Sequence, residues 1–326
     1  MENEIFAKFP VGVKVKLGEL CIKLLEEQKK TWPTLGAAYK GLAEVQIKSL
    51  FCNGCKVLVQ FNPARSVSSG AAVDQESIKK RACFLCPDNL PCEQKGILYK
   101  KKYLILCNPA PIFEKHFTIV HVQHQPQAIT GSIESLLDIS ADLSPDFIVF
   151  YNGPACGASA PDHLHFQAVP ANVLPLSEIF PDHFGKIENT PVQIYKAEGI
   201  NRSAVIISGR DKSLLLSKFA RLMQAAHNIV AASDEPMINV LCFYKDESWR
   251  VIIFFRGKHR PAAFYQEGDR RIFVSPGSID MAGVIITPLK LDFDRLDCEG
   301  ISRIYDEVSI TEEAVNKIIK TIIDGD

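Results

Sequence analysis

The chain has 326 residues, of which 47% are apolar and 23% charged, and its formal net charge is −1. This composition is ordinary for a globular protein with one large or two medium domains, and the absence of a basic excess disfavours a general nucleic-acid-binding surface. No apolar run reaches the roughly 20 residues that span a bilayer, and none follows the acidic N-terminus as a signal peptide would, so we expect a cytoplasmic protein without nucleic-acid or membrane partners.

The first half of the chain alternates short apolar strands with helices. Apolar residues at helical spacing predict a helix that begins near Leu17 and ends near Trp32. A second helix is expected over residues 133–143. Strands are expected at residues 56–61, 103–107, 117–122, 147–151 and 163–169.

The second half repeats this order at larger scale. A strand pair is expected at residues 192–207, a long helix from about Asp211, and strands at 238–243, 250–255 and 283–286. The segment from Ser309 to Glu312 has the Ser-x-x-Glu spacing of a capping box and predicts the start of a C-terminal helix. The pattern indicates an α+β protein with mostly antiparallel sheets and flanking helices. We expect halves at residues 1–175 and 176–326, either as a duplicated fold or as two domains.

The segment His163-Leu164-His165-Phe166-Gln167 is the most informative part of the sequence. In a strand, alternate side chains point to opposite faces, so Leu164 and Phe166 are expected in the core and the two histidines and Gln167 on the other face. A row of imidazole and amide groups is poorly suited to a core and well suited to holding phosphate or metal and to attacking phosphorus.

We interpret His165 as a nucleophile, because a neutral imidazole can attack a phosphoanhydride and hold the nucleotidyl group covalently. Gln167 would donate its amide to a phosphate oxygen. A glutamine has no proton to give to a leaving group or to take from water, so this residue disfavours simple hydrolysis.

Three further segments are candidate nucleotide or phosphate sites. The loop that starts at Asn152 consists of small residues and ends at Ser159, and such a loop lets the backbone approach a ligand. Asn62 and Arg65 follow one apolar strand, and a cluster of cations that includes Arg256 and Lys258 follows another. A solvated charged turn is the alternative interpretation of the last two segments.

Two Cys-x-x-Cys pairs, Cys52/Cys55 and Cys83/Cys86, favour metal over disulfide in a chain without an export signal. They could form a four-cysteine zinc site, or one pair could combine with histidines, because zinc accepts both ligand types. The histidine candidates are His116, His121, His124 and His163. The remaining cysteines, among them Cys92 and Cys298, are expected to be small buried residues.

Taken together, residues 58–170 resemble the histidine-triad-like nucleotidyltransferases, the superfamily of galactose-1-phosphate uridylyltransferase, diadenosine tetraphosphate phosphorylase and the GDP-hexose phosphorylases. The motif His163-x-His165-x-Gln167 matches the transferase pattern His-x-His-x-Gln. The run from Asn62 to Arg65, followed by Cys83-Phe-Leu-Cys86-Pro, is more similar to the uridylyltransferases.

The resemblance implies a nucleotidyl group carried on His165, with Gln167 and Ser159 on the phosphate. It also implies zinc held by Cys83, Cys86, His124 and His163. The expected activity is transfer between a nucleotide sugar and phosphate or a sugar phosphate. The alternatives are cleavage of dinucleoside polyphosphates and a zinc-stabilised nucleotide-binding module without turnover. The sequence does not specify the base, the sugar or the acceptor. It is compatible with a homodimer but does not specify the oligomeric state.

Overall fold

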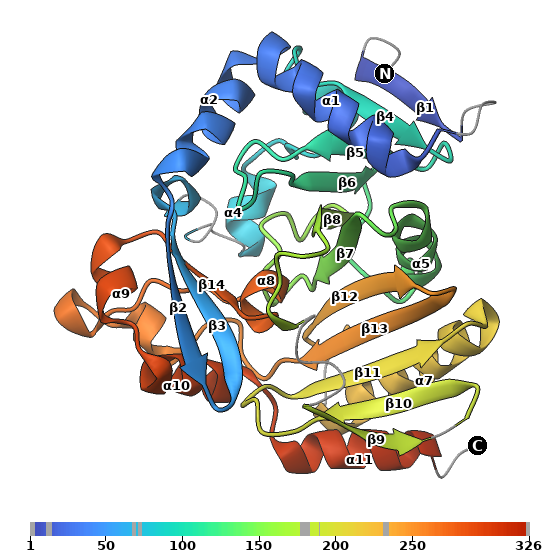
Figure 1. Ribbon diagram of the computed structural model, residues 1–326, viewed down its shortest axis with the longest axis vertical. Coiled ribbons are helices and arrows are strands. Elements are labelled where there is room, and N and C mark those ends of the chain that lie inside the picture. The colour runs from blue at the N-terminus through green and yellow to red at the C-terminus, as the bar shows by residue number, and fades with distance from the viewer. Residues whose placement is uncertain are drawn as a thin grey trace.

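The computed structural model describes residues 4–10, 15–66, 70, 74–176, 183–188, 190–230 and 235–323. One large sheet runs through the molecule from the N-terminal strand to the C-terminal half (Figure 1). In spatial order its eleven strands are β1 (Ile5–Phe9), β4 (Gly96–Tyr99), β5 (Tyr103–Cys107), β6 (Phe117–His121), β8 (His165–Pro170), β7 (Phe147–Asn152), β12 (Ile238–Lys245), β13 (Ser248–Phe255), β11 (Ala204–Gly209), β10 (Val192–Ala197) and β9 (Phe184–Glu188).

The pairings in this sheet are antiparallel except for that between β1 and β4. The predicted α+β class with mostly antiparallel strands is therefore confirmed. The predicted strands are present, each within a few residues of its expected bounds.

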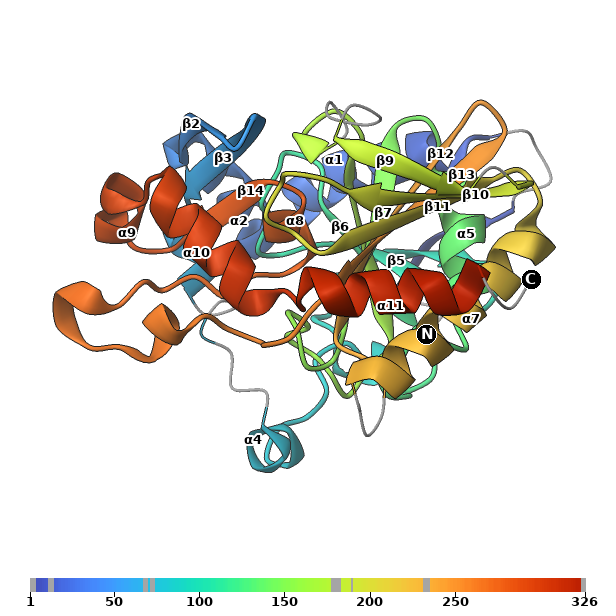
Figure 2. The same cartoon turned by 90° about the horizontal axis from the view of Figure 1, so that it is seen from below.

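One face of the large sheet packs on helices through a single continuous apolar core. The helices of this layer are α1 (Leu17–Thr31), α2 (Pro33–Gly41), α5 (Ile133–Asp142), α7 (Lys212–Val230) and α11 (Glu312–Ile323). Figure 2 shows α7 and α11 side by side under the sheet. Their apolar stripes are buried there, which is the usual source of stability for amphipathic helices.

The other face carries a second core and a small sheet in the order β14-β3-β2. These strands are β2 (Gln46–Cys52), β3 (Cys55–Phe61) and β14 (Val284–Thr287). The short helices α8 (Ser278–Met281) and α9 (Lys290–Arg295) and the longer α10 (Cys298–Val308) pack beside them, while α4 (Gln75–Lys79) stands apart below (Figure 2). Because β14 pairs in parallel with β3, segments from the two ends of the chain share one sheet.

The two halves of the chain join at the centre of the large sheet, where β7 pairs with β12. Asn152 lies opposite Asn239 and Val149 opposite Cys242 across this junction. The division at residue 175 stays a prediction, since the sheet continues across it.

One local prediction, the cap of the C-terminal helix, is changed by the structure. The C-terminal helix begins at Glu312, and the Thr311 hydroxyl oxygen accepts the Ala314 N–H at 3.3 Å, so Thr311 and not Ser309 caps the helix. Ser309 instead ends α10, and the predicted capping box is wrong. Across the described residues, every helix is too short or too polar to cross a bilayer.

Candidate active site

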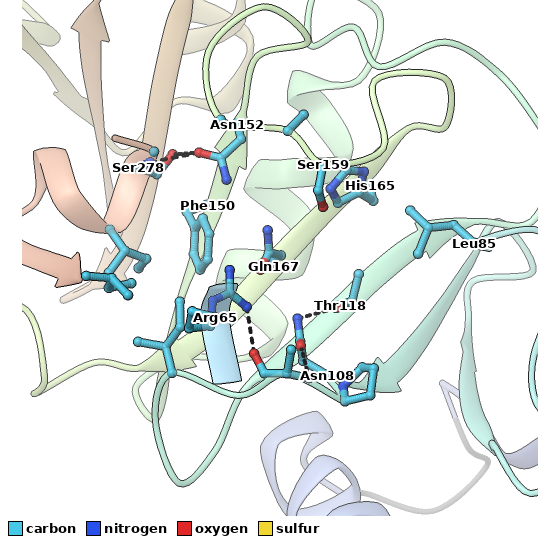
Figure 3. A pocket seen from close by; sticks show the side chains of 18 of the residues that line it. Arg65, Leu85, Asn108, Thr118, Phe150, Asn152, Ser159, His165, Gln167 and Ser278 are labelled. Atoms are coloured by element: carbon cyan, nitrogen blue, oxygen red, sulfur yellow. Dashed lines mark hydrogen bonds between the residues drawn. The ribbon is translucent and has the colours of Figure 1, made fainter. Parts of the chain in front are cut away.

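Strand β8 presents the expected two faces. Leu164, Phe166 and Ala168 are fully buried in the helix-covered core, which holds the strand in register between β6 and β7. His165 and Gln167 point the opposite way and line a cavity (Figure 3). The alternation predicted from the sequence is therefore confirmed for the strand itself.

The cavity has a volume of about 460 Å³, which suits a nucleotide-sized ligand. Its walls come from both halves of the chain. The N-terminal half supplies residues of β8, of the loop after β3 and of the segment between the two cysteines of the second pair; the C-terminal half supplies α8 and the turn after β13. Figure 3 shows His165 and Ser159 close together, with Gln167 nearer to Arg65 and Phe150.

The tautomer of His165 is fixed by its surroundings. Nδ1 lies 2.8 Å from the carbonyl oxygen of His163, and because a carbonyl can only accept, Nδ1 carries the proton. Nε2 is therefore unprotonated in the neutral ring. Burial is the main cause that lowers the pKa of His165 to about 4, so the ring is neutral at physiological pH.

The strand position of His165 is held by a buried glutamine. Gln127 Oε1 accepts the backbone N–H of His165 at 2.8 Å, and its amide nitrogen donates to the carbonyls of His165 and Asn152. Gln127 thus ties β8 to β7 where the strand pairing has ended. No pattern in the sequence marks Gln127 as part of the site.

Asn152 presents a donor to the cavity. Its Oδ1 accepts the backbone N–H of Ser278 at 2.7 Å and the amide of Asn239 at 3.0 Å. A backbone N–H can only donate, so the amide oxygen faces α8 and the amide nitrogen is left for the cavity that Asn152 lines. Asn152 and Ser159, both predicted as phosphate ligands, line the cavity, and that role stays a prediction.

The loop between Asn152 and Ser159 requires glycine at position 157 because of its backbone conformation and its close neighbours. The φ of Gly157 is +109°, and a Cβ there would lie 2.9 Å from the Cα of Gly277. A side chain would therefore meet both strain and collision. The small residues noted in the sequence let this loop approach α8 closely.

Arg65 and Asp280 place opposite charges beside the cavity. Arg65 donates to the carbonyl of Ala110 at 2.7 Å, and burial lowers the pKa of its guanidinium to about 10, so it remains charged. Asp280 is buried and accepts the N–H groups of Gly277 and Ile286, both at 2.9 Å. Burial raises the pKa of Asp280 to about 6.

Three predicted phosphate ligands lie outside the cavity lining. Asn62 is buried and donates to the carbonyl of Pro111 at 3.2 Å. Arg256 is 2% exposed, and its guanidinium donates to Asn239 Oδ1 and to backbone carbonyls of surrounding segments. Lys258 is exposed. Arg256 therefore braces the turn after β13, and that turn contributes His259 and Arg260 to the cavity in place of Arg256 and Lys258.

The predictions of Arg256 and Lys258 as phosphate ligands fail because a cluster of cations in the sequence does not show which of them faces a cavity. Sequence reasoning also missed Ser278 and Asp280, because no local pattern marks a four-residue helix that reaches the cavity from the far half of the chain.

The predicted metal ligands Cys83, Cys86, His124 and His163 form one cluster, with their ligand atoms all within 4.8 Å of one another. His163 Nδ1 lies 3.3 Å from Cys83 Sγ, and His124 Nδ1 lies 3.2 Å from Cys86 Sγ. The Nε2 of His163 lies 2.7 Å from the carbonyl of His121, so Nε2 carries the proton and Nδ1 is free to bind a metal. Two thiolates and two imidazoles are a set that zinc binds tetrahedrally.

The alternative sites built on Cys52 and Cys55 are ruled out in this structure. Cys52 forms a disulfide with Cys298 at the start of α10, which leaves its sulfur unable to bind metal. The expectation of metal over disulfide is therefore wrong for Cys52, and Cys298 is a half-buried disulfide partner and not the small buried residue that the sequence predicts. Cys92 is exposed and not buried as expected. His116 and His121, the other histidine candidates, lie outside the cluster.

Comparisons with known sequences do not give this chain a function. A family model described as a domain of unknown function (DUF4922) matches residues 24–170. No curated protein matches the chain.

Among solved structures, yeast Ap4A phosphorylase Apa2 in complex with AMP is similar with a TM-score of 0.56 and 17% identity, covering 88% of this chain and 96% of that one. Apa2 in complex with Ap4A gives 0.55 and 16%, with 87% and 97% covered. A uridylyltransferase mutant is more distant, with a TM-score of 0.40, 12% identity and 74% and 94% covered. The chain therefore shares its fold with Apa2 over most of its length.

Proposed function

We propose that this chain is a nucleotidyltransferase that carries the nucleotidyl group on Nε2 of His165. The observation that carries the proposal is the orientation of that ring: Nδ1–H is held by the carbonyl of His163, and Nε2 belongs to a buried, neutral imidazole on a cavity wall. A neutral, oriented imidazole with a free ring nitrogen is what nucleophilic attack on phosphorus requires.

In the first step, the Nε2 lone pair of His165 attacks the α-phosphorus of the bound nucleotide. A P–N bond forms, and the P–O bond to the leaving phosphate breaks with its electron pair staying on that oxygen. The imidazole then carries a positive charge, which the carbonyl of His163 stabilises through Nδ1–H. No proton is transferred in this step.

In the second step, an oxygen of phosphate or of a sugar phosphate attacks the same phosphorus, and the P–N bond breaks. The electron pair returns to Nε2, and His165 is regenerated in its starting tautomer. Gln167, Asn152, Ser159 and Arg65 surround the cavity with groups that can donate to phosphate oxygens, and such preorganised donors stabilise the charge that develops there.

A zinc ion held by Cys83, Cys86, His124 and His163 would act structurally. All its tetrahedral positions would be filled by protein, as in closed zinc sites. It would fix His163, whose carbonyl orients His165, and it would fix Leu85, which lines the cavity between the two cysteines.

Nucleotide sugars are the substrate class that the motif favours. Phosphorolysis of dinucleoside polyphosphates is the second candidate. It is supported by the likeness to Apa2, which covers nearly the full length of both chains and extends to structures described with AMP and with Ap4A. The chemistry at His165 would be the same in both cases, because only the leaving group differs.

The test is to incubate the full chain with UDP-, ADP- and GDP-sugars and with Ap4A and to measure its intact mass. We expect one of them to add a nucleoside monophosphate to the wild type and none to add it to His165→Ala. The matched control is His227→Gln, on the far helix α7. An adduct that persists in His165→Ala would contradict the mechanism, and binding without any adduct would favour a binding module.

A further inference from the structure

His116 is a buried histidine that neither the proposed attack nor the metal cluster uses. It is fully buried and lies immediately before β6, at the end of a loop that runs from Asn108. Its Nδ1 lies 3.3 Å from the backbone nitrogen of Ile112, which donates to it. Its Nε2 lies 2.8 Å from Oε1 of Gln167.

These two contacts fix the proton on His116. The N–H of Ile112 can only donate, so Nδ1 is the acceptor and carries no proton. A neutral imidazole has one N–H, which must then be on Nε2. The Asn108 amide nitrogen, 3.5 Å from Nε2, is at the limit of hydrogen-bond distance and donates to Thr118 at 2.9 Å instead.

The proton on Nε2 in turn fixes the amide of Gln167. The atom 2.8 Å from a donor must be an acceptor, so Gln167 turns its oxygen toward His116 and its amide nitrogen away from it. A free glutamine amide can flip by half a turn at little cost and would then present an acceptor to the ligand. An acceptor facing a phosphate oxygen would repel it.

We propose that His116 is a positioning residue that holds Gln167 with its amide N–H groups toward the phosphate of the substrate. The inference rests on the proposed function in one respect, namely that a phosphate binds beside Gln167. Two successive hydrogen bonds link Ile112, His116 and Gln167. Through them, the backbone N–H of Ile112 determines that Gln167 presents its amide N–H groups at the cavity wall.

The surroundings of His116 keep it in this role. Its carbonyl accepts the Tyr39 hydroxyl and the Asn108 backbone N–H, both at 2.9 Å, so the residue is anchored through its main chain as well. Burial and the neighbouring charge of Arg65 lower its pKa to about 3, so the ring stays neutral. A doubly protonated ring would lose the bond from Ile112.

The first test reads the tautomer directly and needs no ligand. Two-bond proton–nitrogen NMR on the full chain with ¹⁵N-labelled histidine gives the protonation of each ring nitrogen, and His116→Gln identifies the signal of His116. We expect the Nε2–H form, with a shift of the Nε2 resonance in Gln167→Ala. The proposal would be overturned if His116 had the Nδ1–H form, or if its Nε2 resonance were unchanged in Gln167→Ala.

The second test is a double-mutant cycle on the formation of the nucleotidyl adduct. Removing one preorganised donor costs on the order of 10²-fold in rate, so we expect Gln167→Ala to slow adduct formation to that extent. Introduced alone, His116→Phe should slow adduct formation at least about tenfold. Added to Gln167→Ala, it should cause no further loss of rate, because a residue that acts only through Gln167 has no effect once that side chain is removed.

Independent losses that multiply in the double variant would mean that His116 acts through general stability, and the proposal would fall. His116→Gln, which keeps a side-chain donor, should retain more activity than His116→Phe. If the wild type forms no adduct with any nucleotide, the proposed function fails while the NMR result still decides the tautomer.

Discussion

At the scale of single residues, three side-chain amides at the cavity are held in one orientation, because each turns its oxygen toward an N–H group that can only donate a hydrogen bond. Gln127 faces the backbone N–H of His165, Asn152 faces that of Ser278, and Gln167 faces the imidazole N–H of His116. Asn152 and Gln167 line the cavity, and in both the oxygen is used inside the protein, which leaves N–H groups for the ligand. These two amides therefore present hydrogen-bond donors to the cavity, a direction that suits the oxygen atoms of a phosphate.

The buried neutral state of His116 makes a prediction about pH. Its pKa is about 3 in the folded protein against 6.5 in the unfolded chain, so protons bind the unfolded state more tightly. Stability contributed by the neutral ring is present above about pH 6.5 and is lost as the pH falls toward 3. At pH 5 the loss is about 2 kcal/mol relative to pH 7.

We therefore expect the stability advantage of wild type over His116→Gln to shrink by about 2 kcal/mol between pH 7 and pH 5. Urea unfolding at both pH values measures it, and comparing the two proteins cancels the other titrating groups. Parallel pH dependence of the two proteins would mean that His116 is not buried as a neutral ring.

At the scale of elements, the sequence predicts what is local and misses what is not. The alternation in β8 is readable because side chains in a strand change faces at every residue. The pairing of β14 with β3 is not readable, since more than 220 residues separate Gln60 from the Ile286 that it faces. The same holds for Ser278, which completes the cavity from the far half. The sequence also predicts Arg256 as a phosphate ligand, because it does not reveal the backbone carbonyls that accept hydrogen bonds from this buried guanidinium.

The cluster of Cys83, Cys86, His124 and His163 leads to a prediction about zinc content. We expect Cys83→Ser to lower bound zinc to well below one per chain, because three ligands remain of a tetrahedral set. Cys52→Ser should leave zinc unchanged, since Cys52 is bonded to Cys298, and exposed Cys92→Ser is the matched control. Elemental analysis of the purified proteins measures the difference. Equal loss in the Cys52 and Cys83 variants would instead support a four-cysteine site.

At the scale of the whole molecule, the two halves are interlaced and do not merely touch. The large sheet continues from β7 into β12, β14 of the second half completes a sheet with β3 of the first, and a disulfide joins Cys52 to Cys298. The cavity takes its walls from both halves. Separating them would expose the edge of β7 and empty one side of the site.

This interlacing predicts that the chain unfolds as one unit. We expect a single calorimetric transition whose van't Hoff and calorimetric enthalpies agree, because neither half keeps a complete sheet without the other. The measurement should be repeated with reductant, so that cooperativity comes from packing and not from the disulfide. Fragments 1–175 and 176–326 should each lack cooperative unfolding when expressed alone. Two separated transitions, or a fragment that folds by itself, would show that the division at residue 175 is a true domain boundary.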